Sequence, residues 1–420
     1  MILLLLALSG VEGQDWPGFR GPNQGHADAH PPVEWSETKN VAWKTAVPGR
    51  GRSSPVLLGG KIFVTRAIER GVVRKRIGPD DMQTAEHAAV GAACLDAATG
   101  KILWDVTLRE VDAPDPVHWF NSWATPTPAV EPGRVYCDFG GVGTWCLDAE
   151  TGKVLWEKVI PMDHQVGPGS SLLLHEKKLI LVRDGRQEQG VLALDAATGD
   201  PLWKTPRPPI EASGGNAKKS FSTPILADGR IVATGPHWIA AYEPSTGKEV
   251  WRLKHGPGFS IGSVPVAAGG TVYFSTGCMR PNLLAVKADG AGDVTSTHLL
   301  WRSQKGIPVM SSPLLSGGRL YYVSDEGIAT SADAATGSPL WQERLGEGHL
   351  ASPILASGRV YFFGREGKTS VFKATDTAER LAENKLDGPL IASPAAVGKA
   401  LFIRTDTHVY RIEGPKTNDQ

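Results

Sequence analysis

Hydrophobic and polar positions alternate along the chain in short runs that turn residues separate. The clearest example is LDAATGKILW at 95–104, and versions of it return at 147–156, 194–203, 242–251 and 332–341. Each copy has a Thr-Gly turn between two apolar runs, and the turn begins with an acidic residue. A carboxylate can accept bonds from the backbone amides just ahead of it, and glycine supplies the positive φ of a tight reversal. Each copy therefore predicts a hairpin between two strands.

A second motif follows in each unit: a Ser-Pro or Thr-Pro start, two apolar residues, a Gly turn, a basic residue and a β-branched or aromatic run. Examples begin at Ser53, Ser222 and Ser311. Each unit therefore contains about four short strands. The motif turns at 96, 148, 195, 243, 287 and 333 lie 44 to 52 residues apart. This period, with four strands per unit, is typical of a β-propeller blade.

The repeats predict an all-β fold, a single eight-bladed β-propeller of four-stranded antiparallel blades over 40–415. The inner strands are expected to begin at Ser54, Thr125, Ser170, Thr223, Val264, Ser312, Ser352 and Ser393. The segment 40–45, NVAWKT, has no hairpin of its own, and the last unit stops before its tryptophan strand. We therefore expect the N-terminal strand around Trp43 to join the last blade and close the ring.

Seven tryptophans recur at the end of the hairpin motif or at the equivalent position. They are Trp43, Trp104, Trp156, Trp203, Trp251, Trp301 and Trp341. A large flat side chain suits the wedge between adjacent blades, where it can bury about 150–250 Å². We expect these tryptophans to be structural.

The segments outside the repeats have their own signatures. Residues 1–13 carry an apolar run followed by small residues, which predicts a signal peptide. Val11 stands where a lipoprotein signal would place its cysteine, so we expect a periplasmic or secreted protein without a lipid anchor. Residues 14–39 form a Gly- and Pro-rich extension, and 416–420 a short tail. The charged insertion at 68–87 in the first blade is expected to be a solvent-facing loop.

Composition excludes several classes of function. The 44 basic and 44 acidic residues balance, so no basic footprint for nucleic acid or an anionic membrane is present. The N-terminal apolar run is too short to span a bilayer. We expect a monomer that binds a protein partner or a small ligand.

The chain has four cysteines. Cys137 and Cys146 flank a turn, so a disulfide between them is one expectation in an oxidising compartment. Two buried thiols are the alternative. None of the cysteines has the spacing of a metal site, and we expect no metal ligands.

Propeller geometry places the residues just before each inner strand around one mouth of the channel. This rule selects ten candidate binding residues: Arg50, Arg52, Trp119, Asn121, Trp123, His164, Lys219, Phe221, Phe259 and His349. Aromatic, basic and imidazole groups there would suit a planar or anionic ligand, or a peptide strand. In the alternative interpretation the aromatic residues plug the channel, the histidines form structural hydrogen bonds and the cations are solvated.

No catalytic motif stands out. The sequence has no phosphate loop of the Walker type. We therefore assign no catalytic residue.

The combined repeat, a Ser-Pro start, a Gly-Arg-Val-Tyr strand and Ala-Leu-Asp-Ala-x-Thr-Gly-x-x-Leu-Trp, resembles the pyrroloquinoline-quinone (PQQ) type of β-propeller repeat. The resemblance covers nearly the whole chain after residue 40 and has two functional branches. One branch comprises non-catalytic scaffolds similar to the periplasmic propeller subunit of the outer-membrane β-barrel assembly machinery. The other comprises quinoprotein dehydrogenases, which would hold PQQ and calcium at the channel mouth. The vicinal cysteine pair of the family's alcohol dehydrogenases is absent here, as is a Cys-x-x-Cys-His haem motif.

Our leading hypothesis is an exported, non-catalytic binding or scaffold module that needs no cofactor and acts through its channel mouth or a blade edge. The alternative is a PQQ-dependent alcohol or sugar dehydrogenase. Carbohydrate binding through exposed tryptophans is a third option.

Overall fold

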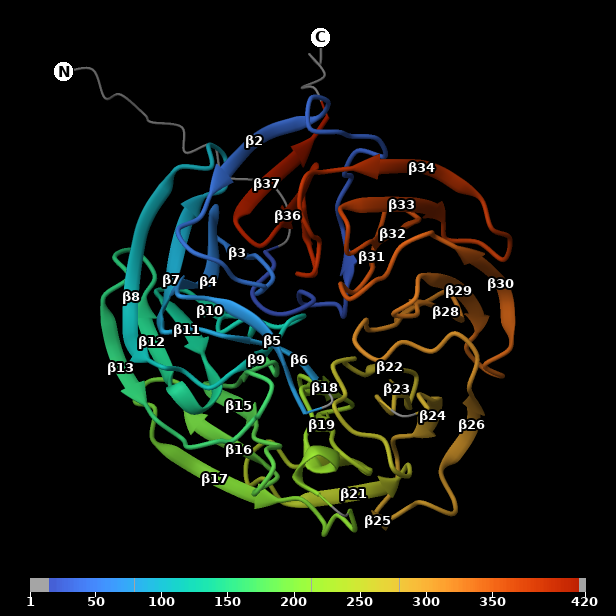
Figure 1. Cartoon of the computed structure of the whole chain (residues 1–420). Coiled ribbons are helices and arrows are strands. Elements are labelled where there is room, and N and C mark those ends of the chain that lie inside the picture. Colours follow the sequence, from blue (N-terminus) through green and yellow to red (C-terminus); the bar gives the residue numbers. More distant parts are fainter. Residues whose placement is uncertain (1–14, 79, 213, 279, 415–420) are drawn as a thin grey trace, which may run out of the picture.

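The computed structural model describes residues 15–78, 80–212, 214–278 and 280–414. These ranges form 37 β-strands and two short 3₁₀ helices, η1 (Gly140–Val142) and η2 (Gly215–Lys218). Figure 1 shows the strands grouped into sheets that stand around a common centre, the arrangement of a β-propeller. The predicted all-β class is confirmed. The expected signal peptide (1–13) and C-terminal tail (416–420) lie outside the described residues.

Eight of the nine sheets in the described ranges have four or five strands, and in each of them four strands are antiparallel. From the centre outward, sheet 1 contains β3 (Val56–Leu58), β4 (Lys61–Arg70), β7 (His87–Asp96) and β8 (Ile102–Asp112), and sheet 2 contains β10 (Ala129–Glu131), β11 (Arg134–Asp138), β12 (Thr144–Asp148) and β13 (Val154–Lys158). Sheet 3 contains β14 (Leu173–His175), β15 (Lys178–Val182), β16 (Gly190–Asp195) and β17 (Pro201–Pro206). Sheet 4 contains β18 (Ile225–Ala227), β19 (Arg230–Thr234), β20 (Trp238–Tyr242), β21 (Glu249–Lys254) and β25 (Gly292–Asp293).

Sheets 5 to 8 follow the same plan. Sheet 5 contains β22 (Val266–Ala268), β23 (Thr271–Ser275), β24 (Leu283–Lys287) and β26 (Leu299–Ser303), and sheet 6 contains β27 (Leu314–Ser316), β28 (Arg319–Val323), β29 (Ile328–Asp333) and β30 (Pro339–Arg344). Sheet 7 contains β31 (Ile354–Ala356), β32 (Arg359–Phe363), β33 (Lys368–Lys373) and β34 (Arg380–Lys385), with β1 (His26–Ala27) beside β31. Sheet 8 contains β35 (Ala395–Val397), β36 (Ala400–Arg404), β37 (His408–Glu413) and β2 (Val41–Ala46).

The core lies between neighbouring sheets. The two middle strands of a sheet are covered on both faces, so they are apolar at nearly every position, as in β15 and β16. The outer strand β17 alternates exposed and half-buried residues because its edge faces solvent. One hydrophobic cluster joins Tyr136 and Cys146 of sheet 2 to Leu179 and Leu194 of sheet 3. Burial of this kind joins each sheet to the next.

The recurring tryptophans also join one sheet to the next through hydrogen bonds. Each of six indole Nε1 atoms donates to a main-chain carbonyl in the hairpin turn of the following sheet. The pairs are Trp43 to Ala97 (3.1 Å), Trp104 to Ala149 (3.0 Å), Trp156 to Ala196 (3.0 Å), Trp203 to Pro244 (3.2 Å), Trp301 to Ala334 (3.0 Å) and Trp341 to Thr375 (3.1 Å). Trp251 is 1% exposed and packs in an apolar cluster.

The conformation of the hairpin turn allows the tryptophan of the preceding sheet to pack against it. In the first copy, Asp96 Oδ1 accepts hydrogen bonds from the amide and the hydroxyl of Thr99, both at 2.7 Å. In the third copy, Gly199 has φ +76°, and a β-carbon there would lie 2.7 Å from the Trp156 ring. Glycine is therefore needed both for the backbone conformation and for the close approach of the indole.

A second circle of contacts surrounds the channel. Each bond joins a main-chain amide at one inner-strand start to a side-chain hydroxyl at the next, over 2.9–3.0 Å. The pairs are Ser54 to Thr127, Thr127 to Ser171, Ser171 to Thr223, Val264 to Ser312, Ser312 to Ser352, and Ser352 to Ser393. This geometry gives the repeated Ser-Pro and Thr-Pro motif a structural reason: the hydroxyl satisfies an amide that would otherwise be buried without a partner.

The two ends of the repeat region meet in sheet 8. Strand β2 pairs antiparallel with β37, with Trp43 opposite Arg411. The buried Arg404 guanidinium donates from Nη2 to Thr65 O at 2.7 Å, and so links sheet 8 to sheet 1. The N-terminal strand thus occupies the place in the last sheet that the sequence left open.

Residues 15–30 pass along the ends of the inner strands opposite their starts, and residues 31–36 continue outward beside sheet 7. Trp16 forms a bridge with Leu57 of sheet 1, and β1 pairs in parallel with β31 of sheet 7. The Trp35 amide donates to Asn384 Oδ1 at 2.8 Å. Trp16 and Trp35 are both buried, so this extension is packed against the ring.

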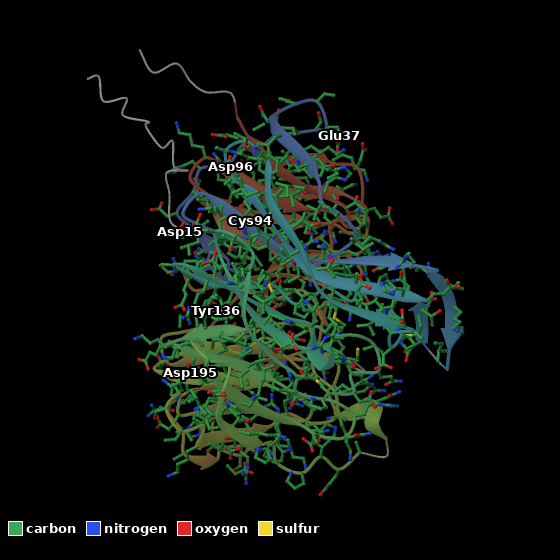
Figure 2. The ribbon with its side chains drawn as sticks, turned by 90° about the vertical axis from the view of Figure 1, so that its left-hand side faces the viewer. Asp15, Glu37, Cys94, Asp96, Tyr136 and Asp195 are labelled. Atoms are coloured by element: carbon green, nitrogen blue, oxygen red, sulfur yellow. The ribbon has the colours of Figure 1, made fainter. Side chains whose placement is uncertain are left out.

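The insertion in sheet 1 differs from the expected loop. It forms β5 (Val73–Ile77) and β6 (Asp80–Thr84), which make a three-stranded sheet with β9 (Val117–His118). In Figure 1 this hairpin lies near the centre of the ring, and in Figure 2 the same blue strands project from one face.

The disulfide expectation for Cys137 and Cys146 is wrong. Cys137 lies opposite Trp145, whereas Cys146 lies opposite Tyr136, so the two thiols point to opposite faces of sheet 2. Both are buried and free, in separate hydrophobic clusters. The alternative of two buried thiols matches the structure.

Candidate functional site

A cavity of about 580 Å³ lies at the centre of the ring, on the face where the inner strands begin. We call it the mouth cavity and this side of the ring the mouth face. Five of the ten predicted residues line it: Arg52, Asn121, Lys219, Phe221 and Phe259. The other five, Arg50, Trp119, Trp123, His164 and His349, are not among its lining residues.

Arg52 holds the loops of the mouth together. Its Nε donates to Asp406 Oδ1 at 3.1 Å, and its Nη1 donates to the carbonyls of Trp119 and Asn121, each at 3.0 Å. Arg50 shares the same carboxylate through Asp406 Oδ2 at 2.8 Å. Both guanidinium groups are thus engaged within the protein, which reduces their capacity to bind an external anion.

The two tryptophans of the aromatic run at 119–123 lie in different surroundings. Trp123 is 5% exposed, donates to Asp115 O at 3.0 Å and packs in the cluster between sheets 1 and 2. Trp119 lies beneath the hairpin, with the Arg74 guanidinium 3.9 Å from its ring centre. Neither residue is among those that line the mouth cavity, and Trp123 is too buried to form an exposed binding surface.

Each of the two predicted histidines forms a hydrogen bond with a main-chain group. His164 Nε2 lies 3.2 Å from the Gly141 amide, which donates to it, and His349 Nδ1 lies 3.0 Å from Glu347 O. Burial lowers the pKa of each imidazole to about 4. Both rings are therefore neutral at pH 7, and neither titrates near neutral pH.

The mouth cavity contains four ionisable residues that the sequence rule missed: Asp80, His118, Cys278 and Asp325. Asp325 Oδ1 accepts the amide of Val309 at 2.9 Å, and burial raises the pKa of its carboxyl to about 6. Lys219, which the rule did find, donates to Gln165 Oε1 at 2.7 Å, and burial lowers its pKa.

A geometric signal could have found Asp325. In a four-stranded antiparallel sheet, the start of the first strand and the loop between the second and third strands lie at the same edge. Asp325 stands in that loop, between β28 and β29. Loops of this kind reach the mouth face as well as the inner-strand starts.

In a quinoprotein dehydrogenase of this repeat type, calcium and PQQ would lie in the mouth cavity. Calcium takes about six to eight oxygen ligands, usually with several carboxylates. Asp80 and Asp325 are the carboxylates that line the cavity, and one oxygen of Asp325 already accepts two amides. In the described part of the chain, no group of three His, Cys, Asp or Glu side chains could hold a metal ion. The donor set does not fit a calcium-bound quinone.

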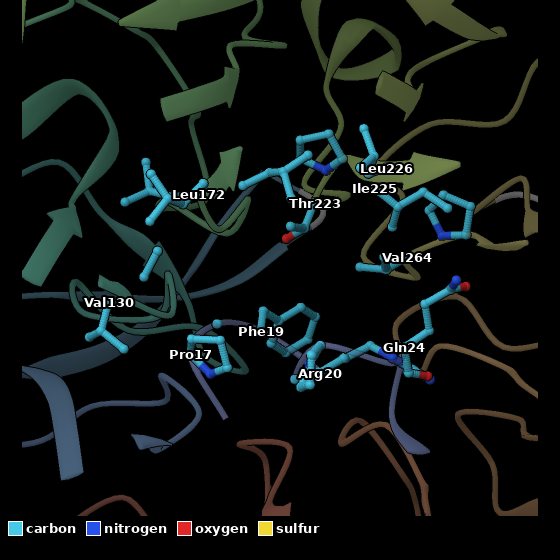
Figure 3. A pocket seen from close by; sticks show the side chains of 18 residues that line it. Pro17, Phe19, Arg20, Gln24, Val130, Leu172, Thr223, Ile225, Leu226 and Val264 are labelled. Carbon is cyan, nitrogen blue, oxygen red and sulfur yellow. The ribbon is translucent and has the colours of Figure 1, made fainter. Parts of the chain in front are cut away.

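A second cavity, of about 280 Å³, lies between the N-terminal extension and the inner strands of sheets 2 to 5. Figure 3 shows Phe19 and Arg20 on one side of it and Thr223 and Ile225 on the other. Phe19 and Thr223 line both cavities. The Arg20 guanidinium donates to Gln24 O at 2.6 Å and Pro313 O at 2.7 Å, and burial lowers its pKa to about 9.

Comparison with known proteins finds two kinds of relative. The 1-butanol dehydrogenase (quinone) of Thauera butanivorans is 27% identical over 260 residues, 57% of this chain but 37% of that protein. The chain thus spans well under half the length of this relative. The outer membrane protein assembly factor BamB of Burkholderia pseudomallei is 23% identical over 352 residues, 68% of this chain and 85% of that protein.

The crystal structure of a quinohemoprotein alcohol dehydrogenase from Comamonas testosteroni matches with a TM-score of 0.65 at 12% identity. The match covers 97% of this chain and 82% of that chain. The ring of sheets and this likeness define the fold as a β-propeller. A family model described as outer membrane protein assembly factor BamB matches residues 88–236 and 235–352. The chain belongs to this family.

Proposed function

We propose that this protein is a non-catalytic binding module that acts in the periplasm or outside the cell and contacts its partner through the mouth face. The observation that carries the proposal is the chemistry of the mouth cavity. Its Arg52 and Lys219 are held by Asp406 and Gln165, and the described residues that line it include two carboxylates, Asp80 and Asp325. What the cavity does offer a partner is Phe221 and Phe259, which line it.

The alternative remains a PQQ-dependent dehydrogenase with the cofactor at the same mouth. The relationship to the butanol dehydrogenase supports it. Two features of this chain weigh against it: the donor set of the mouth cavity, and the absence of a vicinal cysteine pair. The relationship to BamB supports the binding module instead.

We treat the eight larger sheets as eight blades of one closed ring over 40–415, which would be a monomer. The antiparallel pairing of β2 with β37 supports closure, because it leaves no unpaired outer position in sheet 8. The described ranges contain no helix with the length and apolar content to cross a bilayer. The signal-peptide pattern in 1–13 supports export.

Affinity capture from the exported fraction of the native host tests the mouth face. The full chain would be immobilised as wild type, as Lys219→Ala with Phe221→Ala, and as a control. Lys61→Ala is the matched control because Lys61 lies at the opposite end of the strands from the mouth. The proposal predicts a partner that wild type and Lys61→Ala retain and the double variant loses. Equal retention by all three folded proteins would place the binding surface elsewhere.

A further inference from the structure

The hairpin above the mouth presents an open strand edge. In its three-stranded sheet the order is β5, β6, β9, so β5 has a neighbour on one side. All five of its residues are exposed, including Val73 at 56% and Ile77 at 40%. Figure 2 shows this hairpin projecting away from the ring. An edge strand of this kind offers free main-chain donors and acceptors to another strand.

The register identifies which main-chain groups are free. The Trp119 amide donates to Asp81 O at 2.9 Å, so the main-chain groups of Asp81 point toward β9. Asp81 lies opposite Arg76 in the β5–β6 pair. Because antiparallel pairs alternate between bonded and non-bonded positions, Arg76 points its N–H and C=O away from β6. The same holds for Arg74, two residues earlier.

The edge is strongly basic. Arg74, Lys75 and Arg76 follow one another on β5, while the acidic Asp80 and Asp81 lie on the inner strand β6. The Arg74 guanidinium pairs with Asp81. No ion pair of Lys75 or Arg76 occurs among the described residues, and both side chains are exposed. A strand laid along β5 would therefore meet positive charge on both of its faces, from Lys75 on one and from Arg76 on the other.

The positive charges on β5 determine which kind of strand can pair with it. A second copy of β5 would set cations against cations, which is unfavourable for strands in direct register. An acidic strand would gain both main-chain hydrogen bonds and opposite-charge pairs across the edge. We propose that β5 binds an extended acidic segment of a partner protein by strand addition. This inference rests on the proposed function as a binding module, and it names the class of partner.

Fluorescence anisotropy with the full chain and a labelled peptide of alternating Glu and Val tests the proposal. We expect saturable binding that weakens with salt, and no binding by a Lys and Val peptide. The same acidic peptide, N-methylated at alternate residues in either register, should bind about tenfold or more weakly because its main-chain donors are blocked. Equal binding by the methylated peptides would show attraction by charge alone and overturn the proposal.

Two substitutions of Arg76 distinguish the contribution of main-chain hydrogen bonds to binding from the contribution of charge. Arg76→Ala removes the cation and keeps the outward N–H, whereas Arg76→Pro removes both and leaves the β5–β6 bonds intact. We expect Arg76→Pro to bind the acidic peptide about tenfold more weakly than Arg76→Ala does. Equal affinities, with unchanged circular dichroism, would contradict strand addition.

The oligomeric state provides the remaining check. Sedimentation that showed a wild-type dimer abolished by Arg76→Pro would assign the edge to a second copy and overturn the acidic partner. If the β5 variants left partner capture through Lys219 and Phe221 unchanged, the inference would fail while the proposed function stood.

Discussion

Gly247 lies directly against the indole ring of Trp203, so that a β-carbon at this glycine would come within 2.3 Å of the ring. The tryptophan belongs to sheet 3 and the glycine to the hairpin turn of sheet 4. Trp203 Nε1 also donates to Pro244 O in the same turn, at 3.2 Å. One tryptophan thus joins two sheets by packing and by a hydrogen bond, and the repeat reproduces this contact around the ring.

Replacing Trp203 with Ala should lower the free energy of unfolding by about 3 kcal/mol, because it leaves a cavity between two sheets. Trp203→Phe retains much of the packing and loses the hydrogen bond, so it should cost about 1 kcal/mol beyond the change in buried area. Urea unfolding followed by circular dichroism measures both. A loss well below 1 kcal/mol for Trp203→Ala would contradict its packing role.

Gly247→Ala and Gly229→Ala form a matched pair. Both glycines have positive φ, +69° and +72°, but no atom lies within 4 Å of a β-carbon built at Gly229. The backbone penalty of about 1 kcal/mol applies to both. We expect Gly247→Ala to cost a further 1 to 3 kcal/mol, roughly, through its clash with Trp203. Equal losses in urea unfolding would show that the indole can move aside without cost.

The amide-to-hydroxyl bonds between the inner-strand starts allow a similar comparison of two substitutions. Ser312 Oγ accepts the Val264 amide at 2.9 Å, whereas the buried Ser311 Oγ has no hydrogen-bond partner among the described residues. Ser312→Ala should cost about 1 to 3 kcal/mol, since it leaves a buried amide unsatisfied. Ser311→Ala should be close to neutral. The reverse order of stabilities would refute the role assigned to these hydroxyls.

Asp325 gives a prediction for pH. Burial raises the pKa of its carboxyl from 3.8 to about 6, so between these values the folded state holds a proton that the unfolded state has lost. This contribution to stability is present in full below about pH 4 and is lost as the pH rises through 6. Allowing for partial exposure, the loss is about 2 kcal/mol.

Asp325→Asn keeps an oxygen for the two amides and cannot ionise. The stability of wild type minus that of the variant should therefore fall as the pH rises from 4 to 7. The difference is needed because His164, His255 and His349, each with a pKa lowered to about 4, change the stability in the opposite direction. Thermal unfolding at several pH values measures it, and a flat difference would contradict the burial of this carboxyl.

The sequence predicted the repeated parts of the fold because their signals are local. The turn aspartates bond to threonines three residues away, and the tryptophans lie at a constant spacing, so neither depends on the rest of the chain. The pairing of β2 with β37 was inferred from two incomplete units, without any local signal. The rule about inner-strand starts selected ten mouth residues, and five of them line the cavity.

The remainder depended on contacts between distant segments. Trp123 looked exposed, but a bond to Asp115 and packing against sheet 2 bury it. The insertion became a hairpin because β9, more than thirty residues further along, pairs with β6. Asp325 was missed because the rule considered inner-strand starts alone. Composition and spacing carry no information about the partners of Trp123 and β6, whereas the position of Asp325 in its repeat was a signal that the rule did not use.

A titration of the mature protein with PQQ, with and without calcium, tests the central claim most directly. Absorbance and calorimetry would follow binding, because a bound quinone changes its spectrum and releases heat. The account predicts no calcium-dependent binding at micromolar quinone, since the described residues that line the mouth cavity include two carboxylates, and one of these already accepts two amides. Tight calcium-dependent binding of one quinone per chain would contradict it and identify the protein as a quinoprotein.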